Sequence, residues 1–152
     1  MVISYQSIYS RFLSKVTDYD FLQLPKDDVY DFMVTWLHSV ISDPYISSIF
    51  SSLSLKDEIM ELTCEMSNPT TDAMDSEFIT ELISTGMVAA WMEPKVKSIL
   101  NISQMFSGKE QKFYSQSNHL AELKGLLKDA KTDVRKMVRD RGYIHNSYIE
   151  ED

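Results

Sequence analysis

The chain has 152 residues, of which 43% are hydrophobic and 25% charged, and its formal net charge at pH 7 is -8. That length suits one domain with a sizeable core, and the composition is close to that of soluble globular proteins, so wholesale disorder is excluded. The negative charge disfavours a generic nucleic-acid binder, because the field of the whole chain repels phosphate. A single cysteine, Cys64, permits neither an internal disulfide nor a cysteine zinc site.

Targeting signals are not visible in the sequence. The longest apolar runs, such as residues 86–92, fall far short of the roughly 20 residues that a membrane span needs. The first residues lack a basic segment followed by a long apolar core, so we expect no signal peptide. We therefore expect a soluble protein that is made in a cytoplasm and has no membrane partner.

Charge is unevenly distributed along the chain. Residues 1–94 carry four basic and fifteen acidic residues, a balance of -11. Residues 95–142 carry eleven basic and five acidic residues (+6), and residues 143–152 carry three acidic residues (-3). One interpretation is a set of ordinary solvated surfaces. The other is that unlike-charged parts of neighbouring copies meet head to tail, as subunits of a ring do.

Two amphipathic helices are predicted in the first third of the chain. Apolar residues recur at intervals of three and four over residues 4–16, and residues 17–20 break the pattern. A second helix is predicted over residues 25–41, because Pro25 suits a first helical turn and Asp43-Pro44 ends the pattern. The predicted buried faces are Tyr5, Ile8, Tyr9, Phe12, Leu13 and Val16 in the first helix, and Val29, Phe32, Met33, Trp36, Leu37 and Val40 in the second.

The middle of the chain is less regular. Residues 47–54 fit either a short helix followed by a turn or a brief extended segment, and residues 56–66 show a helical alternation of apolar positions. Residues 67–72 have the chemistry of a loop. A third helix is predicted to begin at a cap formed by Asp75 or Ser76 and to continue beyond a bend at Pro94. Gly86 in this helix indicates a close approach of another helix.

The last third is predicted to hold a loop, a long helix and a tail. Residues 101–116 lose the helical period and resemble a projecting hairpin or long loop. The final helix is predicted to begin at Ser115 or Ser117 and to stop at Gly142, and residues 143–152 form an extended acidic tail. The predicted inner face of the final helix is Leu120, Leu123, Leu127, Ala130, Val134 and Met137. The expected fold is mainly α, a small helical bundle in a single domain over residues 1–142.

Residues with catalytic or metal-binding patterns are missing from the sequence. His38, His119 and His145 have no spacing that places ligands on one helix face, and Cys64 fits a buried, inert thiol. The basic residues of the last helix alternate with acidic ones in sequence, as on an ordinary solvated helix. We therefore expect no enzyme activity, no cofactor and no metal site.

Four short segments within residues 30–149 carry a family resemblance: Trp91-Met92-Glu93-Pro94-Lys95, Asn101-Ile102-Ser103-Gln104, Lys112-Phe113-Tyr114-Ser115 and Arg139-Asp140-Arg141-Gly142-Tyr143. With these segments the chain resembles the small neck proteins, or head–tail connectors, of tailed bacteriophages that infect Gram-positive hosts. The resemblance implies a helical bundle with a projecting loop, assembled as a twelvefold ring beneath the portal protein. The ring would extend the DNA channel at the head–tail junction of the virion, without sequence-specific DNA binding, and receive the next neck or tail protein.

The loop and the tail supply the candidate contacts with neighbouring subunits or the portal, because neither has support within one subunit. These residues are Ile102, Met105, Phe106, Lys109, Lys112, Phe113, Tyr114, Tyr143, Ile144, Tyr148 and Ile149. The alternative function is a small acidic helical regulator or inhibitor that binds one host protein, with its acidic residues mimicking nucleic acid.

Overall fold

The computed structural model describes residues 1–16, 23–105 and 110–144, and within these ranges it describes the side chains outside 99–120 and 143–144. About 70% of the structure is helical, which confirms the mainly α expectation. The elements in chain order are β1 (Val2–Ser4), α1 (Tyr5–Lys15), α3 (Lys26–Ile41), α4 (Pro44–Ser47), β2 (Phe50–Lys56), β3 (Glu61–Met66), α5 (Asp72–Met105) and α6 (Glu110–Ile144).

The two predicted N-terminal helices are present. Ser4 caps α1 by accepting a hydrogen bond from the Ser7 amide, and Pro25 immediately precedes α3. Both helices bury most of the apolar stripe that their period predicts, so burial of one face holds them on the core. The prediction is wrong for Phe32 of α3, which is 48% exposed. The fully buried members are Tyr5, Ile8, Tyr9 and Phe12 in α1, and Met33, Leu37 and Val40 in α3.

Residues 56–66 form no helix, which corrects the prediction for this stretch. They are the end of β2, a turn in which Met60 has a positive φ of 54°, and strand β3. Short apolar runs fit both a period of 3.6 and a period of two. The stretch forms a strand and not a helix because only the period of two places Leu62, Cys64 and Met66 together on one buried face of β3. Of the two interpretations of residues 47–54, the extended one is correct for Phe50 onward, since α4 ends at Ser47.

The strands make a three-stranded antiparallel sheet in the order β1-β3-β2. Ile3 pairs with Leu62, and Leu53 pairs with Cys64, so the buried faces of the strands coincide. The sequence analysis did not predict β1, because three residues are too few to show an alternating period.

Helices α5 and α6 are both much longer than predicted. Residues 101–105 continue α5 and residues 110–116 open α6, so the predicted projecting hairpin over 101–116 is wrong, while residues 106–109 lie outside the described part. Pro94 lies inside α5, and Gly142 lies inside α6 with no positive φ. Extending an existing helix is far cheaper than nucleating one, so weak local signals did not end either helix.

The caps predicted for these two helices are also corrected. Thr71 precedes α5, and its hydroxyl accepts the Met74 amide, whereas Asp75 lies one turn inside the helix. Ser115 and Ser117 both lie within α6. Tyr143 and Ile144, predicted as the start of an extended tail, form the last turn of α6. Residues 145–152 lie outside the described part of the chain.

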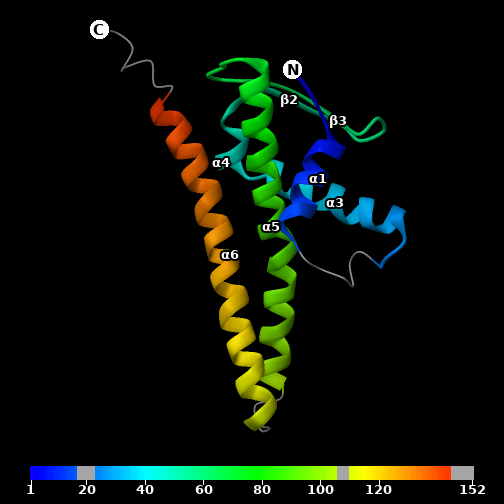
Figure 1. Ribbon diagram of the computed structural model, residues 1–152, viewed down its shortest axis with the longest axis vertical. Coiled ribbons are helices and arrows are strands. Elements are labelled where there is room, and N and C mark those ends of the chain that lie inside the picture. Colours follow the sequence, from blue (N-terminus) through cyan, green and yellow to red (C-terminus); the bar gives the residue numbers. More distant parts are fainter. Residues whose placement is uncertain (17–22, 106–109, 145–152) are drawn as a thin grey trace.

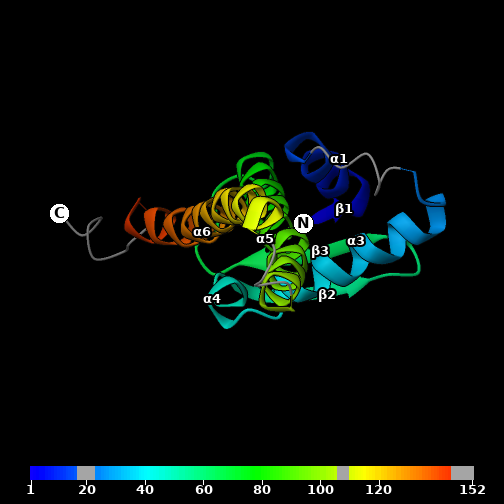
Figure 2. The ribbon, with the colours of Figure 1, turned by 90° about the horizontal axis from the view of Figure 1, so that it is seen from below.

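Helix α5 is the spine of the molecule. Helices α1 and α3 and the sheet gather around one half of it, while α6 runs antiparallel along it and the far half of the pair extends away from the body (Figure 1). Viewed along the pair, α6 and the α1–α3 layer lie on different sides of α5 (Figure 2). At Gly86 the backbone of α5 lies against the Val40 side chain of α3, which confirms the predicted close approach.

Candidate interaction surface

The candidate interface residues fall into two groups at opposite ends of the α5–α6 pair. Ile102 and Met105 lie in the last turns of α5, and residues 112–114 lie in the first turns of α6, so the backbone brings them to the far tip of the hairpin. Tyr143 and Ile144 lie about 45 Å from that tip along α6, at 1.5 Å per residue. Phe106, Lys109, Tyr148 and Ile149 lie outside the described residues. One small surface on a partner therefore cannot contact both groups.

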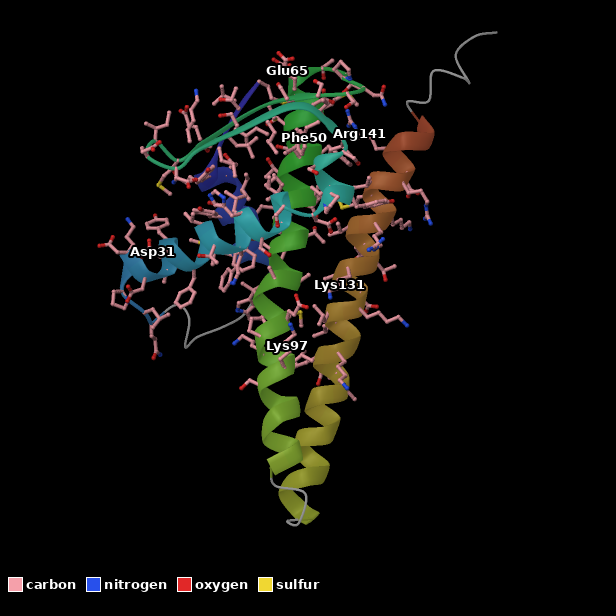
Figure 3. The ribbon with its side chains drawn as sticks, turned by 180° about the vertical axis from the view of Figure 1, so that it is seen from behind. Asp31, Phe50, Glu65, Lys97, Lys131 and Arg141 are labelled. Atoms are coloured by element: carbon pink, nitrogen blue, oxygen red, sulfur yellow. The ribbon has the colours of Figure 1, made fainter. Side chains whose placement is uncertain are left out.

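A buried ion pair fastens the end of α6 to the beginning of α5. Arg141 Nη2 lies 2.6 Å from Asp75 Oδ1, and the two side chains are 11% and 2% exposed. The same nitrogen donates to the Asn68 carbonyl at 3.1 Å, and the guanidinium lies 4.6 Å from the centroid of the Phe78 ring. Figure 3 shows Arg141 on the half of α6 that lies beside the body, and Lys97 on the free half of the pair.

Asp75 is fully hydrogen-bonded despite its burial. Its carboxylate accepts the Thr70 amide at 2.9 Å and the Thr70 hydroxyl at 2.5 Å, in addition to Arg141. Burial acts to raise the pKa of Asp75, but the bonds from Thr70 and the charge of Arg141 outweigh it and leave the pKa below its usual range. The carboxylate is therefore charged at neutral pH, and it organises the loop before α5 as well as the helix pair.

A second charged cluster joins α1 to α5. Arg11 donates to Glu77 at 2.9 Å and to Glu81 at 3.0 Å, and Lys15 lies 2.5 Å from Glu81. Burial acts to raise the pKa of Glu81, and the hydrogen bonds from Lys15 and Arg11 reverse the effect and lower it. Two of the four basic residues in the first 94 are thus paired with carboxylates of α5 within the same chain.

A polar network connects α1, α3 and the turn of the β-hairpin. The Tyr5 hydroxyl donates to Asp57 Oδ1 at 2.6 Å, and His38 Nε2 lies 2.8 Å from Asp57 Oδ2. The hydrogen bond from Tyr5 is the main cause that lowers the pKa of Asp57, and burial is the main cause that raises the pKa of Tyr5. With Tyr5 fully buried and Asp57 about half exposed, the arrangement anchors the hairpin turn to the core.

The charges of α6, which alternate in sequence, are sorted in space. Successive residues of a helix are rotated by about 100°, so the buried positions Ala130 and Val134 define an inner face with a flank on each side. One side, here called the basic flank, carries five exposed basic residues and no acidic one: Lys124, Lys128, Lys131, Arg135 and Arg139. Sequence reasoning missed this stripe because it compared neighbours in the chain, whereas an angular projection of the helix would have found it.

The opposite side of α6, here called the acidic flank, carries Glu122, Asp129, Asp133 and Asp140 together with the single cation Lys136. It borders a groove of about 520 Å³ between α5 and α6, with Lys15 and Glu81 on the far rim. The floor of the groove is apolar, formed by Val88, Leu126, Ala130 and Met137. Leu126 is 50% exposed, so this side of α6 combines negative charge with accessible apolar surface.

A smaller groove of about 240 Å³ lies on the basic side, between α6 and the region of α3 and α4. Arg135 lies 5.3 Å from the centroid of the Tyr45 ring, and the Tyr45 hydroxyl donates to the Arg135 carbonyl at 3.2 Å. Lys131 lies 3.7 Å from Glu93. These contacts connect α4 to α6 and leave Lys124 and Lys128 without a partner among the described residues.

Other features of chemical interest are few in the part of the chain that the structure describes. No group of three or more His, Cys, Asp or Glu side chains there is placed to hold a metal ion. No helix there is long and apolar enough to cross a membrane. Cys64 is fully buried on β3, as predicted for its environment, and burial raises the pKa of its thiol.

Neither a protein-family model nor a curated protein nor a solved structure matches this chain.

Proposed function

We propose that the chain is a structural subunit of the head–tail connector of a tailed bacteriophage, and not an enzyme. In this function, copies of the chain form a ring on the portal protein and extend the DNA channel of the virion. The ring provides the docking surface for the next neck or tail protein.

The observation that carries the proposal is the projecting α5–α6 hairpin. All four segments with the family resemblance lie on these two helices, from Trp91 in α5 to Tyr143 in α6. The far half of the hairpin extends from the body as a bare helix pair (Figure 1), a shape suited to contact with other chains. Its two ends carry the two groups of candidate interface residues, which fits a subunit that contacts different partners along the axis of a ring.

The charge of the chain fits a channel through which DNA slides. A net charge of -8 provides no general attraction for phosphate, so such a ring would not grip the DNA that passes through it. The buried Arg141–Asp75 pair joins the two helices of the hairpin, and the Arg11–Glu81 cluster holds α5 against α1 of the body. A subunit of this kind can then place the hairpin tip in the same position in every copy.

The direct test is assembly on the portal protein encoded by the same phage genome. We expect the purified chain to bind that portal and to form rings visible by electron microscopy. The double variant Lys109→Glu/Lys112→Glu should lose assembly while keeping its helical circular dichroism spectrum. The matched control is Lys26→Glu/Lys56→Glu, which reverses two exposed lysines in the body and should assemble normally.

Two results would contradict the proposal. The first is a chain that binds no portal and has no portal, capsid or tail genes beside its own gene. The second is a monomer or dimer that instead forms a stable complex with one host protein, as the regulator function requires. If the Lys109→Glu/Lys112→Glu variant gave a normal yield of particles, these two lysines would not belong to the interface. The proposed connector function would still stand.

A further inference from the structure

We propose that the basic flank of α6 in one copy packs against the acidic flank of α6 in the next copy, so that neighbouring hairpins lie side by side. The inference rests on the proposed function, because a ring requires two different and mutually complementary surfaces on every subunit. It identifies those surfaces by residue, which the resemblance does not.

The two flanks have the placement that a head-to-tail contact needs. Helix α6 forms a ridge beside α5 (Figure 2), and the flanks lie on its two sides, meeting only near its end, where Arg139 lies 3.5 Å from Asp140. A neighbour on one side meets only positive side chains of α6, and a neighbour on the other side meets mainly negative ones. Two copies related by a twofold axis would instead bring like charges together, which costs free energy.

The flanks also occupy the same turns of the helix. The basic stripe runs from Lys124 to Arg139, about 22 Å, and the acidic stripe runs from Glu122 to Asp140, about 27 Å. Parallel neighbours at the same height therefore pair opposite charges over most of the contact, with Lys136 as the exception. A rotation without a shift along its axis allows a ring to close when whole steps complete a full turn, whereas a shifted contact would produce an open filament.

Apolar surface adjoins the charges on the acidic side. Leu126 is half exposed beside the groove of about 520 Å³, whose floor includes Val88 and Met137. The aliphatic stems of Lys124 and Lys128 of a neighbour could cover such a floor while their ammonium groups reach the acidic rim. This combination favours a protein partner with basic side chains, and α6 of a second copy provides them.

Nucleic acid is the competing occupant of the basic flank. A polyanion there would lie across one helix, about 10 Å in diameter, from the acidic flank, which is about one Debye length at 0.1 M salt. The acidic flank and the net charge of -8 would both repel it. A second copy is not repelled in this way, because its own acidic flank is attracted to the basic flank of the first copy.

The experiment is a charge swap on side chains that are exposed and make few internal contacts. One variant carries Lys124→Glu/Lys128→Glu, and the other carries Glu122→Lys/Asp129→Lys. We expect each variant alone to form rings at least tenfold less well than the wild type, on the portal or at high concentration without it. The equimolar mixture and the chain with all four substitutions should both recover assembly, because every contact is again between opposite charges.

The readouts separate the possible failures. Sedimentation measures assembly, and carbodiimide cross-linking of mixed ¹⁴N and ¹⁵N chains should join Lys124 or Lys128 of one copy to Glu122 or Asp129 of another. Wild-type-like assembly of either single-flank variant, or a mixture that does not recover, would overturn the inference and leave portal binding unaffected. Flank-dependent rings that do not bind portal would overturn the proposed function alone, and absence of any assembly would overturn both.

A nucleic-acid arm completes the test. Fluorescence anisotropy with single-stranded and duplex oligonucleotides should show no binding by the wild-type chain at 0.15 M salt. Binding that Lys124→Glu/Lys128→Glu abolishes, with assembly unchanged, would assign the flank to nucleic acid and overturn the contact between copies. Reversal of Lys26 and Lys56 again serves as the matched control, because both lysines are exposed away from α6.

Discussion

Arg141 and Asp75 are 66 residues apart in the chain, yet Nη2 of the first lies 2.6 Å from Oδ1 of the second in an almost fully buried pair. The pair joins the end of α6 to the first turn of α5, so it contributes, with the packing between them, to the register of the two longest helices. Because α5 also packs against α1 and α3, this register determines where the hairpin lies relative to the body.

Removal of the Arg141 charge should destabilise the protein strongly. Arg141→Met leaves the Asp75 carboxylate buried without its cation, and we expect a loss of about 3 kcal/mol in the free energy of unfolding. Arg139→Met is the matched control, since Arg139 is 57% exposed and should change stability by less than about 0.5 kcal/mol. Urea denaturation followed by circular dichroism measures both. Equal effects of the two variants would show that the Arg141–Asp75 pair contributes no more to the free energy of unfolding than an exposed arginine does.

Stability should fall in acid because of Asp75. Its pKa is lowered in the folded state from an ordinary value of 3.8, so its contribution is fully present above that value and is lost as pH falls through the folded pKa. Asp75→Asn should therefore be less stable than wild type at pH 7 and should lose less stability between pH 5 and pH 3. Parallel curves of stability against pH for Asp75→Asn and wild type would refute this assignment.

An alanine at position 86 should be harmful although alanine favours helices. A Cβ at Gly86 would lie 2.7 Å from Val40 Cγ1 and 3.0 Å from Cγ2, and the branched valine has little freedom to move. We expect Gly86→Ala to cost about 1–3 kcal/mol, whereas Gly125→Ala, with no atom within 4 Å of its added Cβ, should stabilise by about 0.5–1 kcal/mol. Thermal denaturation of each variant measures these two changes in stability.

A double variant tests the cause of that cost. Val40→Ala opens space beside position 86, so the Gly86→Ala/Val40→Ala variant should be more stable than the sum of the single effects predicts. Additive effects would mean that the loss arises from something other than the contact between α3 and α5.

Cys64 should report on opening of the sheet. It is fully buried and burial raises its pKa, so the native protein should react with a thiol reagent about a thousandfold more slowly than the unfolded chain. Ser54→Cys, made in a Cys64→Ser background, provides an exposed thiol on β2 for comparison and should react rapidly. Similar rates for the two thiols would show that the sheet opens easily in solution.

The sequence predicted those elements whose apolar period is long enough to be unambiguous. Helix α1, the inner face of α6 and all of the predicted face of α3 except the exposed Phe32 agree with the pattern, and Ala130 and Val134 are buried as expected. The pattern was misleading where it was short, since Leu62 and Met66 fit a helix as well as a strand. Burial of Leu62 and Met66 on one face of β3, together with its pairing to two other strands, decided between them.

The interaction surface was only partly predictable. The division of charge along the chain was visible in the sequence, and an angular projection of the predicted helix would also have sorted Lys128 from Asp129 to opposite flanks. Partners distant in sequence, such as Arg141 and Asp75, could not be inferred from local signals, because nothing in either segment specifies the other. The loop predicted over residues 101–116 was wrong because packing over a long helix pair outweighs weak breaks in the helical pattern.

The crossing at Gly86 has a geometrical consequence for any closed assembly. It lies roughly 28 Å along α5 from Met105, so a tilt of about 5° at the crossing moves the hairpin tip through an arc of about 2 Å. In a ring, that displacement recurs in every copy, and the accumulated error must vanish over one full turn. In the proposed ring, the absence of a Cβ at Gly86 would thereby help to set the curvature at which neighbouring copies meet.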